Sequence, residues 1–263
     1  MNENVPSPGS VTIRAYAELN DFLPKHWRFR SFTYPLNGGN SLKHLIESAG
    51  IPHTEIELIL INGSSVALEA TVTTGDRISV YPVFESIDVT PLIALRPEPL
   101  RKTRFILDVH LGKLALILRL LGFDAMFPGD IPDEDLARIS ADENRILLTR
   151  DTMLLKRSII THGCWLHSQD TEEQAAEILK RLDLMNSVRP FTRCPECGAF
   201  LEPVSKETIL HRLEPLTKKY YNEFKTCTDC GKIYWRGSHY EPLMKLLERL
   251  NIVIPDDGEK NEN

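Results

Sequence analysis

Short apolar runs alternate with longer runs of helical periodicity in the middle of the chain. The apolar runs cover residues 104–108, 124–127, 145–149 and 164–168, and their starts lie about twenty residues apart, the length of one strand plus one helix. The first intervening run places apolar side chains on one helical face: Leu111, Leu114, Ala115, Leu118 and Leu121. Strands that alternate with helices of this length predict an α/β fold, a parallel sheet with flanking helices.

A different order of elements precedes this part. Alternating apolar and polar positions predict two strands, then a helix that ends at Gly50, a strand with the hairpin signal Asn62-Gly63, and a last strand. These elements cover residues 11–17, 28–34, 40–50, 57–61 and 74–82. Two strands, one helix and further strands predict a β-grasp domain.

An acidic residue follows each predicted strand of the α/β part, at or near the start of the next helix. These residues are Asp108, Asp133, Asp151 and Asp170. Because the carboxyl ends of parallel strands meet at one edge of an open sheet, where ligands bind, we expect the four carboxylates to converge. Converging carboxylates repel one another unless a cation or protons neutralise them, and hard divalent cations prefer oxygen ligands. The pattern therefore predicts a Mg²⁺ or Mn²⁺ site.

Each of these acids has a simpler interpretation when it is taken alone. Aspartate is a favoured N-cap and suits the positive end of a helix dipole, so Asp133 before Glu134 and Asp151 before Thr152 are also typical of helix starts. Recurrence at successive strand ends is what favours a shared site.

Two Cys-x-x-Cys-Gly motifs lie further along the chain, separated by residues 199–226. Paired motifs of this kind predict a closed structural zinc site, and the glycine after each motif tolerates a positive φ. The ligands would be Cys194, Cys197, Cys227 and Cys230. Cys164 lies in an apolar run and is expected in the core.

The same segment interleaves aromatic and basic residues at Lys218–Tyr221 and Lys232–Tyr240. Such residues suit stacking on unpaired bases and contact with phosphates. The alternative, which carries equal weight, is that Tyr234 and Trp235 pack the small core of the zinc-binding segment.

Composition and charge exclude only a few classes of protein. The net charge of -6 argues against a generally sticky nucleic-acid binder, so RNA binding would come from local patches. No apolar run approaches membrane-spanning length, and the first residues lack a secretion signal. We therefore expect a cytoplasmic protein with no membrane partner and no disulfide bonds.

Several of these motifs resemble one family. The segments Asp108–Ala115, Leu118–Asp124, Asp133-Glu134 and Leu148–Asp151 are similar to the Mut-seven C-terminal RNase domain, a PIN-like nuclease that also carries a zinc ribbon. The resemblance covers residues 104 to 240. It implies a metal-dependent ribonuclease with Asp108 and Asp151 as metal ligands and either Asp133 or Glu134 as the third, and at Asp170 only an acid followed by Gln174 fits.

The N-terminal part carries a second resemblance. Residues Gly75–Pro82 are similar to small ubiquitin-like sulfur carriers, which end in a Gly-Gly tail, whereas this chain runs on through Val83–Ile87. The missing tail argues against a carrier role. The segment is also similar to the ubiquitin-like domain that is sometimes fused to this RNase family, which implies a protein partner.

Six segments follow from these patterns and resemblances. They are a disordered start (1–10), a ubiquitin-like β-grasp domain (11–87), a proline-containing linker (88–103), a PIN-like RNase domain (104–188), a zinc ribbon (189–241) and a short helix with an acidic tail (242–263).

The function predicted from this organisation is metal-assisted cleavage of RNA phosphodiester bonds. The catalytic acids would be Asp108, Asp133, Asp151 and Asp170, with Thr149 positioning Asp151 from the strand end, and RNA contacts would come from Lys113, Arg119, Arg150 and Trp235.

Three alternatives remain at this stage. One is a non-catalytic RNA- or ribosome-binding adaptor with a degenerate nuclease domain, and another is the sulfur carrier. The third is a magnesium-dependent phosphatase, which usually needs an Asp-x-Asp motif where this chain has His110 in the second place.

Overall fold

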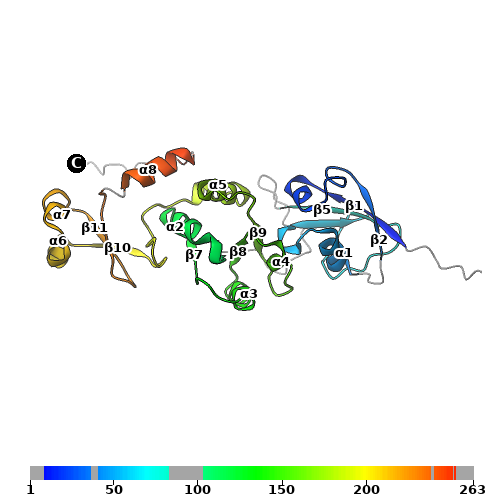
Figure 1. Cartoon of the computed structure of the whole chain (residues 1–263), viewed down its shortest axis with the longest axis horizontal. Coiled ribbons are helices and arrows are strands. Elements are labelled where there is room, and N and C mark those ends of the chain that lie inside the picture. Colours follow the sequence, from blue (N-terminus) through cyan, green and yellow to red (C-terminus); the bar gives the residue numbers. More distant parts are fainter. Residues whose placement is uncertain (1–8, 37–40, 83–102, 238–239, 251, 253–263) are drawn as a thin grey trace, which may run out of the picture. The chain divides into compact units, whose positions relative to one another are not determined.

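The computed structural model describes residues 9–36, 41–82, 103–237, 240–250 and 252 (Figure 1). Most of the predicted disordered start, the predicted linker except residue 103, and the predicted acidic tail from residue 253 lie outside these residues. The chain divides into two compact units. One combines Met1–Lys102 with Pro132–Trp165, and the other combines Thr103–Ile131 with Leu166–Asn263.

The first unit contains a five-stranded sheet in the order β2-β1-β5-β3-β4. Strand β1 pairs in parallel with β5, and the other neighbours pair antiparallel. The strands are β1 (Ser10–Ala15), β2 (Phe32–Pro35), β3 (Leu58–Ile61), β4 (Ser64–Ser65) and β5 (Arg77–Tyr81). This order confirms the predicted β-grasp fold.

Helix α1 (Leu42–Ala49) covers this sheet with an apolar face. It ends where the sequence predicted, because Gly50 has a φ of 118°, and a Cβ built there would lie 2.7 Å from the carbonyl oxygen of Phe22. Only glycine meets both conditions without strain. Two 3-10 turns, η1 (Ala17–Phe22) and η2 (His53–Glu55), complete this part.

One strand of the β-grasp part begins later than predicted. Strand β2 starts at Phe32, whereas the alternating pattern suggested residue 28. Phe29 has a φ of 57°, and the Arg28 side chain bonds back to the carbonyl oxygens of Leu23 and Asp21, so this stretch turns instead of extending.

The α/β part supplies the remaining elements of the first unit and the start of the second. Strand β8 pairs in parallel with β9, and β6 pairs in parallel with β7. In the first unit the elements are α3 (Asp133–Asp142), β8 (Ile146–Thr149), α4 (Thr152–Leu155) and β9 (Gly163–Trp165). In the second they are β6 (Arg104–Leu107), η4 (Val109–Leu111), α2 (Gly112–Leu120), β7 (Asp124–Met126), α5 (Thr171–Arg181) and η5 (Met185–Ser187).

These elements confirm the predicted parallel sheet with flanking helices. The predicted apolar face of α2 is buried, with Leu114, Ala115 and Leu118 fully inaccessible. Strand β9 is shorter than predicted: it ends at Trp165, although the apolar run continues to residue 168.

The end of the second unit is a three-stranded antiparallel sheet in the order β10-β11-β12. Short helices separate the first two strands, and an amphipathic helix follows the third. The bounds are β10 (Leu201–Val204), α6 (Lys206–Ile209), η6 (Leu210–Arg212), α7 (Pro215–Tyr220), β11 (Phe224–Cys227), β12 (Ile233–Tyr234) and α8 (Tyr240–Arg249). Among the described residues, no helix has both the length and the apolar character needed to cross a bilayer.

Candidate functional site

The two cysteine motifs form matching turns. The backbone N–H of Cys194 donates to the carbonyl of Ala199, and that of Cys227 donates to Lys232 in the same relative position. In each turn the glycine N–H bonds to the carbonyl of the first cysteine, and Gly198 and Gly231 have φ values of 84° and 66°. Both motifs therefore fold as the predicted knuckles.

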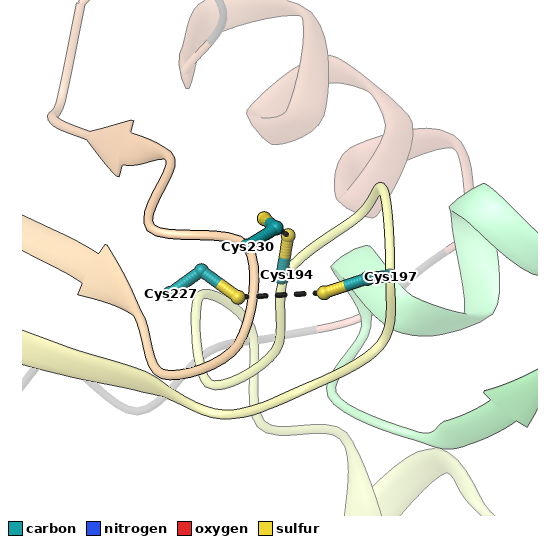
Figure 2. A group of neighbouring side chains, drawn as sticks. All are labelled: Cys194, Cys197, Cys227 and Cys230. Atoms are coloured by element: carbon teal, nitrogen blue, oxygen red, sulfur yellow. Dashed lines mark hydrogen bonds between the residues drawn. The ribbon is translucent and has the colours of Figure 1, made fainter.

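The knuckles bring the four thiols together (Figure 2). Cys197 Sγ lies 3.4 Å from Cys227 Sγ, and Cys194 Sγ lies 3.7 Å from Cys230 Sγ. All four sulfur atoms lie within 4.8 Å of one another, and none forms a disulfide. A tetrahedral ion with metal–sulfur bonds of about 2.3 Å requires sulfur–sulfur edges of about 3.8 Å. The arrangement thus fits a structural metal ion such as zinc, and the predicted convergence is confirmed.

Neighbouring groups give the four thiols different pKa values. Burial raises the pKa of the Cys194 thiol, but bonds from the Tyr234 hydroxyl and from the backbone of Cys197 and Glu196 outweigh it and bring the pKa to about 7. Burial raises the pKa of Cys197 to about 12. Burial also raises the pKa of Tyr234, whose hydroxyl lies 3.1 Å from Cys194 Sγ. Tyr234 therefore belongs to the surroundings of the metal centre.

Arg119 does not take the position expected of an RNA contact. Its side chain is 7% exposed on α2, and its Nε donates to the carbonyl of Ala125 over 2.7 Å. Its Nη1 donates to the carbonyls of Glu196 (2.7 Å) and Pro195 (3.2 Å), the two residues inside the first knuckle. Burial lowers the pKa of Arg119, and the nearby thiols oppose this shift. The prediction of a phosphate contact is wrong here, because the guanidinium is committed to the knuckle.

Trp235 packs into the small apolar cluster next to the metal centre. Its ring lies 6.2 Å from the ring of Phe224 and 6.4 Å from that of Tyr221, and all three pack with Ile209 and Leu213. It is half-buried and also borders a cavity of about 640 Å³ that α2 and α8 line. Of the two interpretations of Tyr234 and Trp235, packing is the one that this geometry favours.

Asp108 and Asp151 occupy corresponding positions after two strands. Asp108 directly follows β6, and its Oδ1 accepts a bond of 2.9 Å from the backbone N–H of His110. Asp151 lies just beyond β8, and its Oδ1 accepts a bond of 2.7 Å from the N–H of Met153. Both are N-caps, as the simpler interpretation requires. Capping uses one oxygen of each carboxylate, so it does not exclude a metal ion at the other.

Thr149 holds Asp151 from the strand end, as expected. Its hydroxyl is completely buried and accepts a bond of 2.9 Å from the N–H of Asp151. The cap at Met153 and this bond together fix the backbone on both sides of the carboxylate.

The other two predicted acids also begin helices. Asp170 caps α5 through bonds from the N–H groups of Glu172 and Glu173. Asp133 is the first residue of α3, is exposed, and lies 4.0 Å from the guanidinium of Arg157. The adjacent Glu134 is exposed too. Nothing in these contacts separates Asp133 from Glu134 as a ligand.

Within the described residues, the four cysteines are the one group that brings three or more metal-ligating atoms within 4.8 Å of one another. The carboxylate site therefore stays a prediction. Lys113 and Arg150, predicted to contact RNA, are exposed, and so is His110.

The structural roles of three residues were not anticipated. The sequence offers one indication for Arg119: it follows Ala115 by four positions, which places it beside the apolar face of α2. Glu55 and Trp165 carry none: Glu55 is 2% exposed and accepts a bond from the backbone N–H of Trp165, a residue 110 positions away.

The fold and the site together define a ubiquitin-like domain joined to an α/β nuclease-like domain with a four-cysteine cluster that could hold a metal ion. Residues 103–247, more than half of the chain, match the family described as Mut7-C RNAse domain, and residues 9–88 match the Mut7-C ubiquitin family. The chain belongs to the Mut7-C RNAse domain family, and the two matches confirm the resemblances to this RNase domain and to the ubiquitin-like domain fused to it.

Two solved structures are similar to 29% of the chain. One is the crystal structure of small archaeal modifier protein 1 from H. volcanii, with 16% identity and a TM-score of 0.24 over 99% of that chain. The other is SAMP1 from Haloferax volcanii, with 19% identity and a TM-score of 0.23 over 97% of that chain. None of the curated proteins matches this chain.

Proposed function

We propose that this protein is a metal-dependent ribonuclease that hydrolyses RNA phosphodiester bonds. The observation that carries the proposal is the matched placement of Asp108 and Asp151. Each follows a buried strand of a parallel pair and is fixed by a backbone N–H at the start of the next helix. Family membership supplies the reaction class.

Asp108, Asp151 and either Asp133 or Glu134 would hold Mg²⁺ or Mn²⁺, with Asp170 as a further catalytic acid. The donor set fits such an ion, because these carboxylate oxygens are hard ligands and Mg²⁺ keeps several waters where few carboxylates bind it. A bound ion would activate a water and stabilise the leaving oxygen. Lys113 and Arg150, both exposed, would contact the phosphates of the RNA.

We further propose zinc as the ion at the cysteines, because four thiolates select zinc over magnesium or calcium. All four ligand positions would come from the protein, so this zinc would stabilise the fold and leave no open position for substrate. We also propose the segment boundaries that the sequence predicts. The same proposal includes a cytoplasmic location and a protein partner for the ubiquitin-like domain.

The experiment is an RNA cleavage assay on purified protein with Mn²⁺ or EDTA, on structured and unstructured RNAs. Asp108→Asn and Asp151→Asn should each abolish metal-dependent cleavage. Asp183→Asn is the matched control, because Asp183 is exposed and has a φ of 49°, which asparagine tolerates well. Cleavage that survives EDTA and both substitutions would reject the metal mechanism.

The third ligand can be assigned in the same assay. If Asp133 binds the ion, Asp133→Asn should reduce cleavage far more than Glu134→Gln, and the reverse result would assign Glu134. Equal, small effects would remove both residues from the site.

One observation favours a second function, a non-catalytic RNA-binding adaptor. Asp108, Asp151 and Asp170 all serve as N-caps, which explains each of them without a metal. The adaptor predicts RNA binding without cleavage of any RNA tested, and binding that Asp108→Asn leaves intact.

A further inference from the structure

Three consecutive polar residues are buried at η2 of the ubiquitin-like part. His53, Thr54 and Glu55 are 6%, 3% and 2% exposed. Burying polar side chains is costly unless they are hydrogen-bonded. Helix α1 supplies one partner, because His53 Nδ1 lies 2.7 Å from Glu47 Oε1.

Further partners come from residues 155–165 of the nuclease-like part. His53 Nε2 lies 2.8 Å from the carbonyl oxygen of Ile160, and Glu55 accepts a bond from the backbone N–H of Trp165. Lys156 Nζ donates to the carbonyl of Glu47 on α1 over 3.0 Å. These contacts explain why residues 132–165 form one compact unit with the N-terminal part.

Apolar contacts reinforce the polar ones. The ring of Phe22 lies 5.0 Å from that of Trp165. The two parts also meet at Gly163, where an added Cβ would lie 3.4 Å from Thr54 Oγ1. The contact is thus specific at several points.

Trp165 connects this contact to the strand end that carries Asp151. It pairs with Thr149 in the β8–β9 register, and its indole Nε1 donates to the carbonyl of Arg150 over 3.1 Å. Arg150 immediately precedes Asp151. Glu55 therefore holds the backbone of Trp165, whose side chain holds the turn at Asp151.

We propose that the ubiquitin-like domain acts within the same chain as a brace for the nuclease-like domain, with Glu55 and Trp165 as positioning residues for the Asp151 carboxylate. The proposal rests on the proposed function for its catalytic meaning. Its structural content, that loosening residue 55 loosens the turn at residue 151, is independent of activity.

Hydrogen exchange on the full chain without RNA tests that content. The amides of Asp151 and Met153 report on the turn, because they bond to Thr149 Oγ1 and to the Asp151 carboxylate. Glu55→Ala should speed exchange at Trp165 about tenfold or more, since a buried amide loses its acceptor, and should speed exchange at Asp151 and Met153. Glu55→Gln keeps an acceptor oxygen and should restore slow exchange. Glu69→Ala, an exposed acid on the same domain, should change nothing.

Trp165→Phe tests the hydrogen bond from the Trp165 indole to the Arg150 carbonyl by itself. It also replaces the first test if the Glu55→Ala variant does not fold. It keeps a ring beside Phe22 but loses the donor to Arg150, so exchange should rise at Asp151 and Met153 and not at α1. Unchanged exchange at Asp151 and Met153 would overturn the proposed brace. In the cleavage assay the same variant should lower kcat and leave KM unaltered. Absence of cleavage by the unsubstituted protein would refute the proposed function and leave the exchange result standing.

Discussion

Replacing Arg119 by methionine tests how the cysteine centre is attached to the α/β core. Methionine has a similar length and an apolar stem, so it can fill the space but cannot donate. The substitution would leave the carbonyls of Ala125, Pro195 and Glu196 without the donor that now serves all three. Gly198 of the knuckle also approaches this side chain closely, with an added Cβ 3.2 Å from Arg119 Nε.

The magnitude follows from the burial and the bonds. A hydrogen bond with a charged partner contributes about 1.5–3 kcal/mol, and each buried carbonyl left unpaired costs about 1–3 kcal/mol, although these values do not add. The three bonds together, reduced because their energies do not add and because those to Pro195 and Glu196 are only partly buried, give an expected loss of about 3–5 kcal/mol. At about 2–4 °C per kcal/mol, the unfolding midpoint should fall by roughly 6–20 °C.

Two assays check this expectation. Calorimetry or circular dichroism gives the unfolding midpoint, and a chromogenic chelator follows the release of zinc, which should be faster because the first knuckle loses its support. Arg138→Met is the control, since Arg138 is exposed and its ion pair, within the described residues, is with Asp135 on its own helix. That change should cost at most about 1 kcal/mol. A cost for Arg119→Met no larger than for the control would refute the assigned role of Arg119.

Three further predictions concern the metal centre and the ubiquitin-like domain. Removal of zinc by a strong chelator, or Cys197→Ser, should lower the unfolding midpoint of the full chain, and a zinc content well below one per chain in the purified protein would contradict the closed four-cysteine site. Gly50→Ala should destabilise by more than about 1 kcal/mol in urea unfolding, because it adds a clash to a left-handed φ, whereas Gly63→Ala (φ 89°, with open space around the added Cβ) should cost less; equal costs would exclude the clash. The backbone N–H of Thr73 and the side chain of Asn62 lower the pKa of Asp76 below its usual 3.8, so this carboxylate stabilises the fold above that pH and loses its effect as the pH falls through the lowered pKa. At pH 7 Asp76→Asn should therefore lower the free energy of unfolding by about 0.5 kcal/mol, a small cost because the group is solvent-screened, and the difference should close as the pH falls through the lowered pKa; a difference independent of pH would refute this.

Local signals explain which parts of the fold were predictable. Gly50, the Asn62-Gly63 turn and the cysteine knuckles are each specified within about five residues, by positive φ or by ligand spacing. The apolar face of α2 follows from periodicity alone. The late start of β2 escaped prediction because the turn at Phe29 depends on bonds from Arg28 to earlier carbonyls, which alternation does not encode.

The residues of the candidate sites were likewise predictable where local signals specify them and not where distant contacts do. The cysteine centre was predictable because each knuckle presents its thiols locally and the two motifs then need only to meet. Arg119 was misassigned, because its carbonyl partners Pro195 and Glu196 lie 76 and 77 positions away and a basic residue beside an apolar face has the same local signature in either role. The helix-starting positions of the four acids were predicted correctly, yet capping and metal binding share that signature, so sequence alone cannot choose between them.

In the proposed mechanism Asp108 and Asp151 share one divalent ion. Manganese binding, measured by electron paramagnetic resonance on protein whose cysteine centre already holds zinc, tests it without requiring an RNA substrate. We predict that Asp108→Asn and Asp151→Asn each weaken Mn²⁺ binding by about tenfold or more, and that the double variant loses less than the sum of the two free-energy changes, as expected for ligands of one ion. Manganese affinity that neither substitution changes, or losses that simply add, would contradict a shared site.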